Sequence, residues 1–248
     1  MHHFFAEPGG VKGDRIELAG PDVNHIKNVL RMKPGEELLI SDGSGQDYRC
    51  CLESLEGERV RARILEKALS RELPAELWLF QGLPKGDKME LIIQKAVELG
   101  ACAVVPVATK NAVVKLDEKK ARAKTARWQA IAESAAKQSK RSRIPQVGRV
   151  MGFSEALSYI EETGFDLCLI PYENEEGMEG ARQAVRAAAA GMKIAVFIGP
   201  EGGFDGAEIE RAKKAGVRPV SLGKRILRTE TAGLALLSVL MMKLEGGL

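Results

Sequence analysis

The stretch from Lys193 to Phe204, KIAVFIGPEGGF, decides how the second half of the chain folds. It begins with a short, largely apolar run of the length of a buried strand, and a charged helical pattern follows from Asp205. The glycine-rich turn between them therefore joins a strand to a helix. Because turns of this kind point backbone N–H groups at bound anions, the first question is which ligand this turn accepts.

The turn matches neither of the two common phosphate-binding templates. A P-loop needs a lysine directly after its last glycine, but Gly203 is followed by Phe204 and Asp205. A dinucleotide fingerprint needs G-x-G-x-x-G, and the carboxylate of Glu201 inside the turn would repel a phosphate. We therefore expect a ligand that is neutral or cationic where it meets Glu201.

Apolar runs and amphipathic helical patterns alternate on both sides of this turn. This alternation is typical of βαβ units and predicts an α/β domain with a mostly parallel sheet. Gly100 and Gly216 stand where left-handed C-caps end two of the helices, and a last helix from about Thr229 is apolar nearly all round. Such a helix belongs in a core or in a subunit interface. The strands are expected at 76–83, 102–108, 165–172, 193–199 and 217–223.

The first part of the chain has a different pattern of apolar runs and turns. Short runs with strand character at 15–20, 37–55 and 58–69 are separated by glycine-rich turns, and one helical segment is inserted at 21–32. This pattern predicts a small β-barrel. We therefore place one domain at 1–73 and a second at 74–248.

Composition limits the classes of function. The 248 residues are 45% hydrophobic and carry a net charge of only +3, so affinity for nucleic acid must come from where the charge lies. The N-terminal residues lack the features of a signal peptide and no apolar run is long enough to span a membrane, which favours a soluble cytoplasmic protein. The four cysteines are expected to be free thiols. No pair of histidines has the spacing of metal ligands, so we predict that the protein binds no metal.

The stretch SLGKRILRTETAGLAL, from Ser221 to Leu236, runs from a strand through a basic loop into the last helix. Thr229 or Thr231 can cap that helix, and Glu230 is favourably placed near its positive end. Capping does not explain Ile226 and Leu227 between charged residues. We expect this loop to close over a flat, apolar ligand such as a purine ring.

Basic residues are concentrated between Lys115 and Arg143, a stretch that contains ten basic residues and only three acidic ones. This run is either a solvated helix face or a surface for RNA, whose affinity for proteins depends mainly on phosphate contacts. The same two interpretations apply to Lys85 and Lys88 in QGLPKGDKMELII. These lysines are either solvated in a turn between a strand and a helix or in contact with a polyanion.

Four motifs together resemble one family. FIGPEGGF and LGKRILRTETA, with KGDKMELIIQKAVELG and RWQAIAESAAKQSKR upstream, are similar to the ribosomal small-subunit RNA methyltransferase E family, which belongs to the SPOUT superfamily. The resemblance spans essentially the whole chain, including HIKNVLRM. It implies a PUA-like RNA-binding barrel, an α/β domain with a C-terminal trefoil knot, and a homodimer. It also implies methylation of N3 of a uridine in 16S rRNA, or in the small ribosomal subunit, with S-adenosylmethionine as methyl donor.

The resemblance also implies site residues. The donor loops would be 169–172, 198–203 and 221–228, and Arg228, Glu201 and Glu230 would lie at the reacting end. Contacts to the donor are expected from Leu169, Ile170, Pro171, Ile198, Gly199, Pro200, Gly202, Gly203, Ser221, Leu222, Gly223, Ile226, Leu227 and Thr231. Contacts to RNA are expected from His25, Arg31, Lys85, Lys88 and Arg141.

Three positions depart from the family pattern, and two other classes of function stay open. His3 and Asn111 stand where the family commonly has arginine, and Lys137 stands where it commonly has an acid. These differences affect which side chains would contact RNA. The alternatives are a non-catalytic RNA-binding factor in ribosome assembly and a nucleotide-dependent enzyme that uses IGPEGG as a phosphate cradle.

Overall fold

The computed structural model describes residues 1–247 and divides into two compact units. The first unit comprises Met1–Glu72 together with Ala136–Ile144, and the second comprises Leu73–Ala135 and the chain from Pro145 onward. The first junction falls within one residue of the expected boundary at 73. The grouping of Ala136–Ile144 with the first unit differs from the continuous second domain that the sequence predicted.

The first unit is a six-stranded sheet in the order β1-β4-β5-β6-β3-β2, antiparallel except for the parallel pair β1–β4. Its core contains Phe4, Ile16, Ile26, Leu38 and Val60, all nearly inaccessible to solvent. The strand β1 was not expected from the sequence, although three of its four residues are buried. The elements are β1 (His2–Phe5), β2 (Val11–Lys12), β3 (Arg15–Leu18), α1 (Pro21–Asn24), a π-helical turn (His25–Val29), β4 (Glu37–Ser41), β5 (Asp47–Glu56) and β6 (Arg59–Ala68).

The second unit is an α/β fold built on a parallel sheet in the order β10-β8-β7-β12-β11-β13, with β9 paired to β8. The expected alternation of strands and helices is confirmed. The elements are β7 (Glu76–Gly82), α2 (Lys88–Glu98), β8 (Ala103–Ala108), α3 (Glu118–Ser139), β9 (Gln146–Val147), β10 (Met151–Gly152), α4 (Phe153–Thr163), β11 (Leu167–Pro171), α5 (Glu179–Ala187), β12 (Lys193–Ile198), α6 (Gly206–Lys214), β13 (Arg218–Val220) and α7 (Thr229–Leu244).

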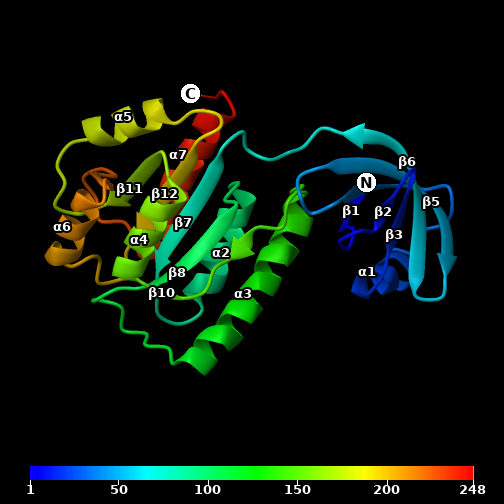
Figure 1. Ribbon diagram of the computed structural model, residues 1–248, viewed down its shortest axis with the longest axis horizontal. Coiled ribbons are helices and arrows are strands. Elements are labelled where there is room, and N and C mark those ends of the chain that lie inside the picture. The colour runs from blue at the N-terminus through cyan, green and yellow to red at the C-terminus, as the bar shows by residue number, and fades with distance from the viewer. Residues whose placement is uncertain (248) are drawn as a thin grey trace. The chain divides into compact units, whose positions relative to one another are not determined.

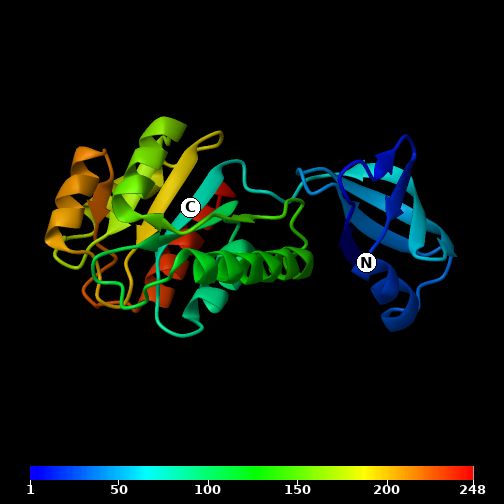
Figure 2. The same ribbon diagram turned by 60° about the horizontal axis from the view of Figure 1, so that its bottom comes forward.

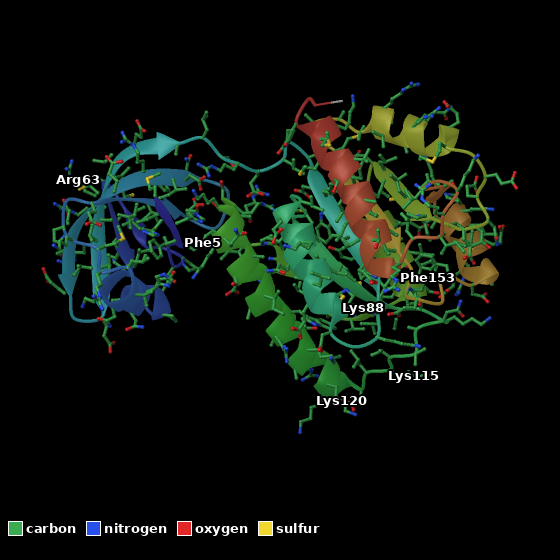
Figure 3. The ribbon with its side chains drawn as sticks, turned by 180° about the vertical axis from the view of Figure 1, so that it is seen from behind. Phe5, Arg63, Lys88, Lys115, Lys120 and Phe153 are labelled. Atoms are coloured by element: carbon green, nitrogen blue, oxygen red, sulfur yellow. The ribbon has the colours of Figure 1, made fainter. Side chains whose placement is uncertain are left out.

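Helices cover both faces of this parallel sheet (Figures 1 and 2). On one face, Phe80 and Phe197 stack at 4.5 Å between ring centroids and pack against Phe153 of α4 and Ile209 of α6. On the other face, α2 and α7 lie against each other and α7 contacts β7 and β12, as the view from behind shows (Figure 3). Because all the strands are parallel, the loops that follow β11, β12 and β13 emerge at one edge of the sheet.

The helix ends agree in part with the sequence patterns. Gly100 and Gly216 adopt the left-handed conformation, with φ of 90° and 77°, directly after the C-cap residues of α2 and α6, as predicted. The expected threonine cap of α7 is wrong: Arg228 occupies the N-cap position, and no side chain caps the helix there. Thr229 makes a long-range hydrogen bond instead, as described below.

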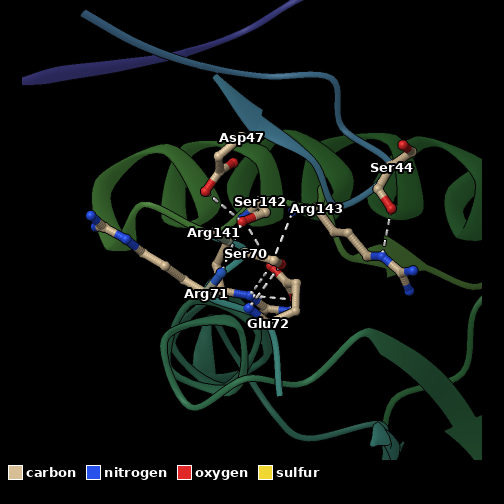
Figure 4. A network of polar contacts seen from close by, with 8 residues as sticks. All are labelled: Ser44, Asp47, Ser70, Arg71, Glu72, Arg141, Ser142 and Arg143. Atoms are coloured by element: carbon tan, nitrogen blue, oxygen red, sulfur yellow. Dashed lines mark hydrogen bonds and ion pairs between the residues drawn. The ribbon is translucent and has the colours of Figure 1, made fainter. Parts of the chain in front are cut away.

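Buried polar side chains hold the segment Ala136–Ile144 within the first unit (Figure 4). The Arg141 residue is only 4% exposed, and its Nε donates to both Glu72 carboxylate oxygens at 2.9 and 3.0 Å. The Ser142 hydroxyl donates to Asp47 at 2.7 Å. A buried arginine already occupied by a carboxylate is poorly placed to contact RNA, so the structure speaks against that expectation for Arg141.

Two of the departures from the family pattern have partners in this unit. The His3 ring nitrogen Nε2 lies 2.6 Å from the Ser41 hydroxyl, and desolvation by burial lowers the pKa of His3 below its ordinary value. The Lys137 ammonium pairs with Asp22 at 2.8 Å. Both side chains therefore have structural roles in this chain.

None of the helices within residues 1–247 combines the length and the apolar character that a membrane span requires.

Candidate active site

A cavity of about 490 Å³ lies at the edge of the parallel sheet where the loops after β11, β12 and β13 meet. Its volume is in the range of small-molecule sites. The lining residues are Lys88, Pro171, Tyr172, Glu173, Ile198, Gly199, Pro200, Glu201, Gly203, Phe204, Ser221, Leu222, Gly223, Lys224, Arg225, Ile226, Leu227, Arg228, Thr229 and Ala232. The three segments at 169–172, 198–203 and 221–228 therefore come together around one cavity.

Ten of the fourteen residues expected to contact the donor line this cavity. Leu169 and Ile170 do not, because both are fully buried within the sheet, and Gly202 and Thr231 are also outside the lining. Ile226 does line it, yet its side chain is 84% exposed and covers little. The sequence reasoning missed Glu173, Phe204, Thr229 and Ala232 as lining residues; the first three directly follow the predicted segments, and Ala232 lies one turn further along the last helix.

The loop 199–203, called here the glycine loop, is fixed at its first carbonyl by α7. The buried Thr229 hydroxyl donates to the Gly199 carbonyl at 2.6 Å and accepts from Gln81 Nε2 at 2.9 Å. Gln81 is completely buried at the end of β7. This chain of hydrogen bonds joins β7, the glycine loop and the start of α7 across the sheet.

The other end of the glycine loop is held by Asn111. Its side-chain amide donates to the Gly202 carbonyl at 3.0 Å and more weakly to the Gly203 carbonyl at 3.4 Å. A Cβ atom at Gly202 would lie 3.1 Å from Asn111 Cβ, so the two residues are in close contact. Asn111, the third residue that departs from the family pattern, thus holds this part of the cavity wall in place.

Glu201, in the middle of the loop, is bonded to protein groups through both carboxylate oxygens. The Lys85 backbone N–H lies 3.1 and 3.3 Å from the two oxygens, and the Lys88 ammonium pairs with Oε1 at 2.9 Å. Burial alone would raise the pKa of Glu201. Hydrogen bonds from Lys88, from its own amide and from Lys85 bring that pKa below its ordinary value.

Glu230, in the first turn of α7, shares the same ammonium. Lys88 Nζ lies 3.3 Å from Glu230 Oε2, an oxygen that is screened from solvent and accepts no hydrogen bond from the described residues. A hydrogen bond from its own amide lowers the pKa of Glu230, and Lys88 lowers it further against the opposing effect of burial. Since neither carboxylate has a raised pKa, the site holds two weak bases.

Arg228 is the predicted reacting-end residue that remains available to a ligand. It lines the cavity and forms no ion pair with any residue between 1 and 247. The cavity thus combines basic side chains, carboxylates and an apolar surface from Ile198, Leu222 and Phe204. The basic residues are Lys88, Lys224, Arg225 and Arg228, and the carboxylates are those of Glu173 and Glu201.

The residues expected to contact RNA are distributed between the two units. Arg31 is exposed and adopts a left-handed conformation with φ of 53°, and His25 begins the π-helical turn six residues earlier. In the basic run from Lys115 to Arg143, Lys120, Arg122, Arg127, Lys137 and Arg141 pair with carboxylates. Carboxylates of the same chain therefore neutralise much of the positive charge from which an RNA-binding surface was predicted.

No three histidine, cysteine, aspartate or glutamate side chains gather as a group that could hold a metal in the part of the chain that the structure describes.

Comparison with known protein families identifies two matching domains. The RNA methyltransferase domain matches residues 71–241, and the RNA methyltransferase PUA domain matches residues 18–65. Among curated proteins, the ribosomal RNA small subunit methyltransferase E of Bacillus subtilis is 40% identical over 235 residues, which are 93% of this chain and 91% of that protein.

Solved structures show the same similarity. The ribosomal RNA small subunit methyltransferase E of Neisseria gonorrhoeae, bound to S-adenosylmethionine, is 36% identical with a TM-score of 0.81, and the match covers 96% of this chain and 95% of that one. A protein from Legionella pneumophila, also in complex with this cofactor, is 31% identical with a TM-score of 0.79 and covers 96% of both chains.

Proposed function

Because the chain belongs to the ribosomal RNA small subunit methyltransferase E family, we propose that it methylates N3 of one uridine in the 16S rRNA of the small ribosomal subunit. It is an S-adenosylmethionine-dependent rRNA methyltransferase. The choice of N3 of uridine rests on the motif resemblance and on the chemistry of the cavity. The observation that carries it is the meeting of Arg228, the glycine loop and the loop 221–228 around one cavity.

The cavity fits S-adenosylmethionine in size and in its apolar surface. Its volume of about 490 Å³ and its apolar wall suit a nucleoside, and its charged lining combines the carboxylates of Glu173 and Glu201 with four basic side chains, those of Lys88, Lys224, Arg225 and Arg228. The backbone around Leu222, Gly223 and Ile226 would hold the adenine, and Ile198 to Gly203 would lie along the rest of the donor. When bound, this cofactor supplies a methyl group on a positively charged sulfur, which needs no metal for activation.

The protein must then orient the uracil and accommodate loss of its N3 proton. We assign Arg228 to the uracil oxygens, where its guanidinium stabilises the negative charge that develops on deprotonation. Glu201 and Glu230 have lowered pKa values and are bonded to Lys88, so they are poor proton acceptors. By stabilising the uracil anion, the Arg228 guanidinium favours loss of the N3 proton to solvent, and the two carboxylates maintain the shape and charge of the site.

The proposal extends to the assembly and the substrate-binding unit. The first unit, with its PUA-domain match, would bind rRNA through the surface around His25 and Arg31. A homodimer is supported by apolar side chains that stay exposed on neighbouring helices, Leu91 of α2 and Val239 and Met242 of α7. Cytoplasmic location follows from the substrate. The trefoil knot stays a prediction from the resemblance.

The experiment that tests this function uses the purified chain, S-adenosylmethionine and either 16S rRNA or small ribosomal subunits. Mass spectrometry of the digested RNA should show 3-methyluridine at one position. A non-catalytic assembly factor would bind RNA and leave its nucleosides unchanged. A nucleotide-dependent enzyme would bind ATP in calorimetry and not S-adenosylmethionine.

A further inference from the structure

The ammonium of Lys88 joins three segments that are far apart in the sequence. Lys88 is the first residue of α2, at the label in Figure 3, and its Nζ lies 2.9 Å from Glu201 in the glycine loop and 3.3 Å from Glu230 in α7. The Lys85 backbone N–H, in the turn before α2, binds the same Glu201 carboxylate. The turn after β7 thus holds the glycine loop against the start of α7.

These contacts conflict with the role that the sequence predicted for Lys88. A lysine that grips RNA phosphates presents a solvated ammonium, but the side chain of Lys88 is only 32% exposed and its charge faces two carboxylates. A phosphate would have to displace Glu201 and then lie beside two negative charges. Lys88 also lines the cavity, where an ammonium without these partners would repel a cationic ligand.

We propose that Lys88 is a positioning residue of the donor site, which fixes the glycine loop to the first turn of α7, and that it makes no contact with RNA phosphate. The inference rests on the proposed function only in taking this cavity as the donor site. Through Glu201 it sets the position of the loop, and through Glu230 it sets the helix turn that begins directly after Arg228. One ammonium thus ties the cavity wall to the residue assigned to the uracil.

Removal of this ammonium would leave two carboxylates facing each other. The remaining charged group that acts on them is Arg228 before α7, which lowers the pKa of Glu230, whereas Lys85 in the turn before α2 contributes its backbone N–H. Two neighbouring carboxylates resist simultaneous ionisation, so the pair would hold a proton at a higher pH. The glycine loop would also lose its side-chain link to α2.

The test compares Lys88→Met with Lys88→Arg, which keeps the charge, and with Lys95→Met. Lys95 is a matched control, because it lies on the same helix and pairs with Glu98 away from the cavity. The first measurement follows the carboxyl carbons of Glu201 and Glu230 by NMR in the ligand-free protein. The second measures the dissociation constant of S-adenosylmethionine by calorimetry, and the third measures the salt dependence of RNA binding.

We expect Lys88→Met to raise the titration midpoints of both carboxyl groups and to weaken S-adenosylmethionine binding about tenfold, because the glycine loop would no longer be held in its binding position in the free protein and would have to be ordered on binding. Lys88→Arg should keep the titration midpoints and the donor affinity close to those of the wild type, and Lys95→Met should change neither quantity. The slope of RNA affinity against salt should stay that of the wild type in all three variants.

The inference is overturned if Lys88→Met leaves the carboxyl titrations and the donor affinity unchanged, or if it lowers the salt slope by about one, as loss of a phosphate contact would. Failure of the proposed function is a separate result. A wild-type chain that binds S-adenosylmethionine but forms no 3-methyluridine would contradict the target nucleoside, and the NMR and calorimetric comparison would still decide the role of Lys88.

Discussion

The hydroxyl of Thr229 donates a 2.6 Å hydrogen bond to the carbonyl of Gly199, thirty residues earlier in the chain. The same hydroxyl accepts from Gln81 Nε2, so one small side chain satisfies two buried polar groups. The bond sets where the glycine loop leaves β12 relative to where α7 begins. Both the stability of the second unit and the shape of the cavity therefore depend on it.

Replacement of Thr229 by valine keeps the shape of the side chain and removes the hydroxyl. The Gly199 carbonyl and the Gln81 amide then lose a partner in a buried site, which should cost about 1–3 kcal/mol of unfolding free energy. Thr229→Ser, which retains the hydroxyl, is the control and should lose less. Urea unfolding measures both, and equal stability of the valine variant and the wild type would contradict the account.

Gly82 lies at the end of β7 directly beneath the glycine loop. A Cβ there would come within 2.7 Å of Pro200, so Gly82→Ala should push the loop away, costing about 1–3 kcal/mol of stability and weakening S-adenosylmethionine binding. The control is Gly180→Ala in α5, where a Cβ meets nothing within 4 Å. That change should be neutral or stabilising. Thermal unfolding and calorimetry of the two variants provide the comparison.

Arg228→Ala should lower the methylation rate constant far more than the affinity for the donor, because the guanidinium acts on charge that develops on the uracil. A loss of about 100-fold or more in kcat is expected from removal of such a group. Single-turnover kinetics, with calorimetry for the donor, separate the two effects. Equal losses in rate and in donor affinity would instead give Arg228 a binding role.

Arg141→Met removes one partner of a buried ion pair in the first unit and should destabilise the protein by about 3 kcal/mol. Arg122→Met on α3 is the control, because Arg122 and Glu118 are largely exposed and their pair should contribute less than about 1 kcal/mol. Chemical unfolding distinguishes the two. RNA affinity that falls in Arg141→Met without any loss of stability would restore the RNA contact that the sequence suggested.

The pH dependence of stability follows from the lowered pKa of Glu201. Because the folded protein favours the ionised carboxylate, this group stabilises the fold above its unfolded pKa, about 4.3, and the contribution disappears as the pH falls through the lower folded value. Glu201→Gln should therefore be less stable than the wild type at pH 7, and the difference should vanish at strongly acidic pH. A difference that stays constant from pH 7 to pH 3 would contradict this role.

Local sequence patterns predicted the architecture because they depend on local physics. The alternation of apolar runs and amphipathic helices defined the parallel sheet, and Gly100 and Gly216 marked helix ends through a backbone conformation that glycine adopts at little cost. The motif resemblance predicted the three loops that surround the cavity. These features need no knowledge of which distant residues meet.

The features that the sequence did not reveal all depend on long-range contacts. The roles of Thr229, Lys88 and Glu201 are set by partners 30 or more residues away, and local capping rules gave Thr229 the wrong role. The segment Ala136–Ile144 belongs with the first unit because Arg141 and Ser142 bond to Glu72 and Asp47. Nothing in a charge pattern distinguishes such a buried arginine from one that faces RNA.

The methylation of uridine N3 in 16S rRNA is tested most directly by mass spectrometry of 16S rRNA nucleosides from a strain in which the gene for this chain is deleted. We expect 3-methyluridine to disappear from the small-subunit RNA, to return when the wild-type gene is restored, and to stay absent with Arg228→Ala. An unchanged level of 3-methyluridine in the deletion strain would contradict the assignment.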